Sequence, residues 1–170
     1  PTISSDEIVV IFSADMSGGY GGKDLWMVTK VARGQWSEPA NLGPAVNTDG
    51  DEMFPFLHND GSLYFASDGH VGMGGLDIYK SELDDNGIYV SAINLKYPIN
   101  SSADDFGMIV ERESERGYFS SNRVIWTGKN GVKKKTNGSD NIYQFELPPL
   151  VLTLQGVITD TKTGDVITGA

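Results

Sequence analysis

Hydrophobic residues in this chain come in short runs that alternate with polar residues and are separated by turns rich in glycine, asparagine and aspartate. The Asp60-Gly61 pair suits one tight hairpin turn between two such runs. No stretch shows the 3.6-residue period of an amphipathic helix. The pattern therefore predicts an all-β chain of small antiparallel sheets. The unit around this turn reads as four strands, over residues 54–58, 63–66, 77–80 and 89–95.

The unit recurs along the chain at an offset of 53 residues. The second copy echoes the first at Phe12 and Phe65, Asp24 and Asp77, Asn41 and Asn94, and Asn47 and Asn100. A third copy runs from Phe119 to Tyr143 and carries about ten extra residues within 124–137. Several anchors at one offset without a gap indicate a true internal repeat.

A unit of about 50 residues with four strands is typical of a β-propeller blade. We therefore predict three blades, at about 1–53, 54–106 and 107–147, followed by a linker and a new element in 148–170. Propellers close with about four to eight blades. We accordingly expect these three to be part of a larger propeller, with earlier blades before Pro1 or on another chain.

Two stretches carry a family resemblance. Residues 1–6 and 55–61 resemble the Pro-x-x-Ser-x-Asp-Gly start of the TolB-like, WD-type propeller repeat. Residues 34–42, followed by Asn47 and the Asp51-Glu52 pair, are similar to the propeller of OmpA-family envelope proteins of Bacteroidetes-type bacteria, which include a component of the type IX secretion machinery. The resemblance covers residues 1–147. The third copy departs from it, because Ser114-Glu115-Arg116 replaces the Asp-Gly turn.

The last segment has a different pattern. Pro148-Pro149 marks a boundary, and residues 152–160 read as a strand that a turn at 161–165 connects to a second one. This pattern resembles the first hairpin of a carboxypeptidase regulatory-like β-sandwich, here truncated. In the family resembled, an OmpA-like peptidoglycan-binding domain comes next. Any contact with peptidoglycan is therefore expected through a domain that is not in this sequence.

Composition narrows the function classes. The 13 Lys and Arg stand against 23 Asp and Glu, a net charge of -10 that argues against nucleic acid as a partner. The absence of cysteine excludes disulfides, thiol nucleophiles and Cys-ligated metals. With only two histidines, a His-rich metal centre is not expected. No apolar run is long enough to span a membrane as a helix.

Four acidic residues recur just before the first, innermost strand of a predicted blade: Asp51, Glu52, Asp104 and Asp105. That position predicts that they lie near one mouth of the central channel. One hypothesis is a ring of carboxylates that binds a cation or a basic segment of a partner. The alternative is that each copy caps a turn by accepting backbone N–H bonds, which recurrence in successive blades favours.

Glycine-rich loops precede the third strand of the first two units, at 18–24 and 72–77. A phosphate-binding loop is excluded because Asp24, rather than Ser or Thr, follows Lys23 and no helix is predicted after it. The glycines are expected to form tight loops. Abundant oxygen ligands leave a calcium ion here as an open alternative, and no other cofactor is expected.

The insertion in the third copy contains an aromatic and a basic cluster: Trp126, Lys133, Lys134 and Lys135. An exposed aromatic beside basic residues suits contact with an acidic partner or an anionic surface. The alternative is a solvated loop without a partner.

No Gly-x-Ser-x-Gly elbow is present, and no acid pair breaks the repeat symmetry as an active site would. We therefore expect a non-catalytic scaffold that binds a protein partner through loops and the channel mouth. The resemblance implies a periplasmic, outer-membrane-associated protein that links secretion machinery to peptidoglycan. The alternatives are the propeller domain of a hydrolase, acting on peptides or glycosides, and a calcium-binding propeller.

Overall fold

The structure is a computed structural model that describes residues 1–111, 116–124, 126–127, 134–135, 138–146 and 162–163. Every regular element in these residues is a β-strand, and every strand pairing is antiparallel. The all-β class predicted from the hydrophobic pattern is therefore confirmed. No helix that could cross a membrane occurs in the described part of the chain.

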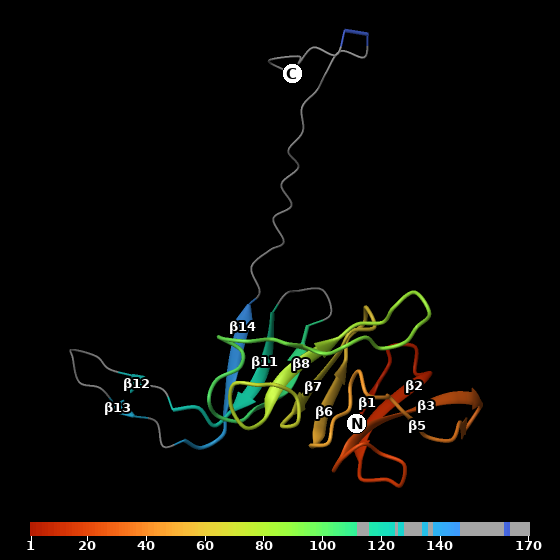
Figure 1. Cartoon of the computed structure of the whole chain (residues 1–170), viewed down its shortest axis with the longest axis horizontal. Helices are drawn as coiled ribbons and strands as arrows, with labels where there is room; N and C mark the ends of the chain where they lie inside the picture. Colours follow the sequence, from red (N-terminus) through yellow and green to blue (C-terminus); the bar gives the residue numbers. More distant parts are fainter. Residues whose placement is uncertain (112–115, 125, 128–133, 136–137, 147–161, 164–170) are drawn as a thin grey trace.

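The strands form three main sheets and one small hairpin (Figure 1). The first sheet contains β1 (Thr2–Ile3), β2 (Val9–Ala14), β3 (Asp24–Ala32), β4 (Gln35–Trp36) and β5 (Ala40–Asn41), with both β4 and β5 paired to β3. The second sheet has the order β6 (Glu52–Leu57), β7 (Leu63–Ser67), β8 (Asp77–Ser81) and β9 (Ile93–Asn94). The third has the order β10 (Asp105–Val110), β11 (Arg116–Ser121) and β14 (Asn141–Glu146). The hairpin pairs β12 (Trp126–Thr127) with β13 (Lys134–Lys135).

The fourth strand of the second unit is shorter than the sequence predicts. Instead of a strand over 89–95, only Ile93–Asn94 pairs with β8, and Tyr89 forms an isolated bridge with Leu83. The cause is a tight turn at 84–88, where the Asp84 carboxylate accepts the backbone N–H of Ile88 at 2.9 Å. Asp and Asn side chains commonly stabilise turns in this way.

The sequence repeat is a repeat of sheets. Each unit pairs a phenylalanine on its second strand with an aromatic residue on its third: Phe12 with Trp26, Phe65 with Tyr79, and Phe119 with Tyr143. The last two pairs stack with ring centroids 5.9 and 5.5 Å apart. Offset-stacked aromatic pairs add stabilisation beyond their buried area.

The three sheets stack face to face, so that the second sheet is covered on both sides. Side chains on a strand alternate between faces. On β7, Phe65 therefore packs in the core shared with Ile11 and Leu25 of the first sheet, while Tyr64 packs in the core shared with Phe119 of the third. Within the described residues the sheets do not close into a ring, so the propeller stays a prediction.

A buried asparagine holds the segment after the fourth strand against the third strand. Asn47 Oδ1 accepts the backbone N–H of Leu25 at 2.8 Å, and its Nδ2 donates to the Leu25 carbonyl at 3.1 Å. Asn100 makes the same pair of bonds to Ile78, both at 2.8 Å. Because a side-chain amide carries both a donor and an acceptor, it bonds the outward N–H and C=O of the third strand as a neighbouring strand would. This requirement explains why Asn recurs at the 53-residue offset.

Candidate functional site

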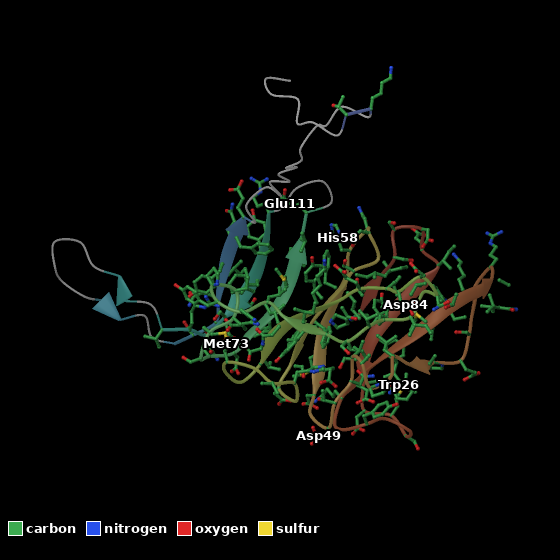
Figure 2. The ribbon with its side chains drawn as sticks, turned by 45° about the horizontal axis from the view of Figure 1, so that its top comes forward. Trp26, Asp49, His58, Met73, Asp84 and Glu111 are labelled. Atoms are coloured by element: carbon green, nitrogen blue, oxygen red, sulfur yellow. The ribbon has the colours of Figure 1, made fainter. Side chains whose placement is uncertain are left out.

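The first strands of all three sheets line one cleft with a volume of about 860 Å³. β1, β6 and β10 are edge strands that each pair on one side only. The cleft lies where these strands end and turn into their hairpins, and Figure 2 shows His58 and Glu111 together at this end of the stack, with Asp49 at the opposite end. This is the concave surface on which the three repeats converge.

Apolar side chains form much of the cleft wall. Ile3 on β1 and Ile109 on β10 are 50% and 51% exposed, and Phe56 on β6 and Tyr118 on β11 also line the cleft. Exposed apolar surface gathered in a concavity is typical of a binding site.

Bulges interrupt the first strands of the second and third sheets. Pairing shifts between Met53 and Phe56 on β6 and between Phe106 and Ile109 on β10. Phe54 and Gly107 in these bulges have φ values of 54° and 64°. A bulge bends its strand and increases the local twist. Both strands are therefore bent just before the segments that line the cleft.

A polar rim joins the second and third sheets. His58 Nδ1 lies 2.9 Å from Asp60 Oδ1, and its Nε2 lies 3.4 Å from the Glu111 carbonyl oxygen. The Glu111 carboxylate accepts two bonds from the Arg116 guanidinium, at 2.9 and 3.1 Å. Burial alone would raise the pKa of Asp60, but N–H donation from Ser62 and the neighbouring His58 hold the pKa below its ordinary value of 3.8.

Replacing Asp60 with asparagine is expected to reduce the loss of stability in acid. A carboxyl whose folded pKa is depressed stabilises the fold above its unfolded pKa of 3.8, and that stability disappears as the pH falls through the lower folded value. Urea unfolding between about pH 6 and about pH 3 measures this slope. Asp85→Asn, an exposed acid in a turn, controls for the lost charge. Parallel curves for both variants and the wild type would contradict the assignment.

The four recurring acids lie at the other ends of the strands, outside the cleft. Glu52 and Asp105 are both 0% exposed. Glu52 accepts the N–H and hydroxyl of Thr48, at 2.8 and 2.6 Å, and the Ser67 hydroxyl at 2.6 Å. Asp105 accepts the N–H of Ser101 at 2.6 Å and the guanidinium of Arg123. These bonds are the turn-capping alternative that the recurrence favours.

Asp51 and Asp104 join neighbouring sheets. Asp51 Oδ1 accepts the backbone N–H of Lys23, which precedes β3, at 2.7 Å. Asp104 Oδ1 accepts the N–H of Leu76, which precedes β8, at 3.0 Å. Both carboxylates are partly exposed, so contact with a partner at these two positions stays a prediction.

The glycine-rich loops are held by the aspartates that follow them. Asp24 accepts the N–H of Tyr20 at 2.7 Å, and Asp77 accepts the N–H of Gly74 at 3.1 Å. A Cβ on Gly74 would lie 2.2 Å from the carbonyl oxygen of Ala103, so the loop needs glycine to approach the next unit. No group of three or more His, Asp or Glu side chains that could hold a metal ion occurs in the described part of the chain, and a calcium ion in these loops stays an open alternative.

Of the predicted contact residues in the third-copy insertion, Lys133 and the side chains of Trp126, Lys134 and Lys135 lie outside the described residues. The backbone pairs Trp126 with Lys135 in the small hairpin. The predicted strands after Pro148 also lie outside the described residues. Partner contact through the insertion and a β-sandwich hairpin after Pro148 therefore stay predictions.

The cleft residues Ile109, Tyr118 and Glu111 are absent from the sequence-based candidates. The sequence places His58 on an inner strand without linking it to the third unit. The available signal is the first-strand position of each unit, because equivalent strands of stacked sheets lie side by side.

Comparisons of the chain with protein-family models, with curated proteins and with solved structures gave no match.

Proposed function

We propose that the chain is part of a β-propeller that serves as a non-catalytic platform, with the three-strand cleft as the contact site for a protein partner in the bacterial envelope. The observation that carries this proposal is the convergence of three edge strands around one apolar concavity. Two observations support the propeller: the sheets stack face to face, and their sequences repeat at a fixed offset of 53 residues between the first two units. Strand edges that have no strand partner, beside apolar side chains, suit an extended segment, which adds main-chain bonds to side-chain burial.

The place of the protein in the cell follows from the resemblance alone. The similarity of residues 34–42 to OmpA-family envelope proteins supports a periplasmic location at the outer membrane, next to secretion machinery. In this proposal the peptidoglycan contact belongs to another domain. The exposed Glu7 at the rim of the cleft, together with the net charge of -10, favours a basic segment in the partner.

Ile109→Asp is expected to lower the affinity of the cleft for its partner at least tenfold, because burying an unpaired charge in the complex costs more than about 1.4 kcal/mol. Ile109 is half-exposed, so the free protein should keep its fold. The partner is recovered with the intact protein from native envelope extract, and calorimetry then measures its affinity for each variant. Val31→Asp is the matched control, because Val31 is 64% exposed on β3 outside the cleft.

Equal weakening by both variants would contradict the cleft assignment. A hydrolase screen tests the competing class of function. Turnover of peptide or glycoside substrates that disappears when a single acid is replaced would overturn the non-catalytic proposal.

A further inference from the structure

The outer edge of the third sheet differs from those of the other two sheets. β5 pairs with β3 in the first sheet, and β9 pairs with β8 in the second. Within the described part of the chain, no strand pairs with the corresponding edge of β14, which Figure 1 shows as the outermost strand of its sheet. An unpaired strand edge presents a row of free N–H and C=O groups.

One position measures the difference. Ile142 on β14 lies opposite Ser120 on β11, as Ile78 on β8 lies opposite Ala66 on β7. Ile78 is 0% exposed, whereas Ile142 is 78% exposed. The N–H and C=O of Ile78 both bond outward, away from β7. The matching register directs the same two groups of Ile142 outward, where no described residue meets them.

In the first and second sheets, the segment that covers the outer edge of the third strand has the same sequence pattern. The pattern is Asn-Leu-x-x-x-(Val/Ile)-Asn, at residues 41–47 and 94–100. The Leu N–H donates to the outward carbonyl of the third strand at 3.1 Å in each case, from Leu42 to Leu25 and from Leu95 to Ile78. The aliphatic residue is buried in the adjoining core, and the final Asn bonds both outward backbone groups.

Residues 147–170 do not contain this pattern, because none of them is asparagine. A second copy of the chain contains the pattern twice, but both segments are already bound within their own sheets, where Asn47 and Asn100 are 2% and 0% exposed. In the first sheet Asp24 accepts a bond from Asn41, the first residue of the pattern, at 2.6 Å. Asn141 occupies the position equivalent to Asp24 in the third sheet. Its amide oxygen is an acceptor of the same kind.

We propose that the outer edge of β14 binds an extended segment of a partner protein that carries the pattern Asn-Leu-x-x-x-(Val/Ile)-Asn. The segment adds a strand to the third sheet, its aliphatic residue covers Ile142, and its final Asn bonds the Ile142 backbone. This is strand addition to an open sheet edge, with side-chain pockets that set specificity. The surface is separate from the cleft, so the two proposals can fail independently.

The probe is a fluorescent synthetic peptide with the sequence of residues 38–49, titrated into the intact protein and followed by anisotropy. Saturable binding with a Kd on the order of 10 μM is expected. The same peptide with Asn47→Ala should bind at least tenfold more weakly, because the Ile142 N–H then lacks an acceptor and the Ile142 carbonyl keeps only the bond from the peptide's Leu. Ile142→Asp in the protein should also lower the affinity for the unchanged peptide at least tenfold, whereas Val31→Asp should leave that affinity unchanged.

Amide hydrogen exchange locates the contact. The peptide should slow exchange at Ile142 and leave Ile78, which already donates to Asn100, unchanged. Slow exchange at Ile142 in the free protein would mean that the chain covers its own edge, and would overturn the proposal. Equal affinity of both peptides would also overturn it. So would a concentration-dependent dimer that the peptide does not dissociate, because the occupant would then be a second copy.

Discussion

Replacing Arg123 with alanine is expected to lower the free energy of unfolding by about 3–5 kcal/mol, on the order of 10 °C in Tm for a chain of this size. The Arg123 guanidinium lies 2.6 Å from Asp105 Oδ1 and donates to the carbonyl oxygen of Pro98 at 2.7 Å. Its side chain is 14% exposed and that of Asp105 is 0% exposed. Removing the cation leaves a buried, uncompensated carboxylate that, among the described residues, still accepts hydrogen bonds from the backbone N–H and the hydroxyl of Ser101.

The guanidinium also covers an aromatic pair. Its central carbon lies 5.0 Å from the ring centroid of Phe119 and 5.1 Å from that of Tyr143. Cation–π contacts at such sites contribute about 0.5–2 kcal/mol. Arg123→Lys should therefore recover only part of the loss, because an ammonium group keeps the charge without the planar fork.

Arg116→Ala is the matched control for the Arg123 prediction. Arg116 makes an ion pair with Glu111, but both side chains are substantially exposed, at 48% and 36%. Exposed pairs contribute little to the free energy of unfolding, because water screens the charges. Denaturant unfolding of both variants gives the comparison. If Arg123→Ala costs no more than Arg116→Ala, the buried pair does not stabilise the third sheet. Arg123→Met combined with Asp105→Leu should be less destabilised than Arg123→Ala alone.

The sheets were predictable from the sequence because their cause is local. Alternating apolar residues and Asx turns define the first hairpin of the first and second units, and the 53-residue offset aligns Phe65 with Phe12 without any knowledge of contacts. The turn-capping alternative for Glu52 and Asp105 was accessible for the same reason. Their partners Thr48 and Ser101 lie four residues earlier in the sequence.

The cleft and the Arg123 site depend on contacts between units. Ile3, Phe56 and Ile109 meet only because three sheets stack in register, and bulges bend two of the strands. No local pattern encodes that convergence. The repeat aligns Arg123 with Gly69, which has no side chain to cover the aromatic pair. In the second sheet the ring of the next residue, His70, packs against Phe65 and Tyr79 instead, and its Nε2 lies 2.8 Å from the carbonyl oxygen of Val46.

Asn100→Ala is expected to cost about 2–4 kcal/mol, because it strips a fully buried backbone of its partner and leaves a cavity. The Ile78 N–H loses its acceptor, while the Ile78 carbonyl keeps only the bond from Leu95. Asn59→Ala, at an exposed turn, is the control and should change stability by less than about 0.5 kcal/mol. Thermal and urea unfolding both measure the difference.

Asn100→Asp separates the loss of a bond from the loss of packing. The carboxylate keeps an acceptor for the Ile78 N–H, but its second oxygen faces the Ile78 carbonyl and the Asn94 side-chain oxygen, to which Asn100 Nδ2 donates at 2.8 and 2.9 Å. Burial and this repulsion raise the pKa of the introduced carboxyl above its unfolded value. Its folded state therefore binds a proton more readily than its unfolded state. The penalty relative to wild type should be fully present at pH 7 and should shrink as the pH falls through the raised pKa. A penalty that stays constant between about pH 7 and about pH 4 would mean that the asparagine fills space rather than acting as a strand.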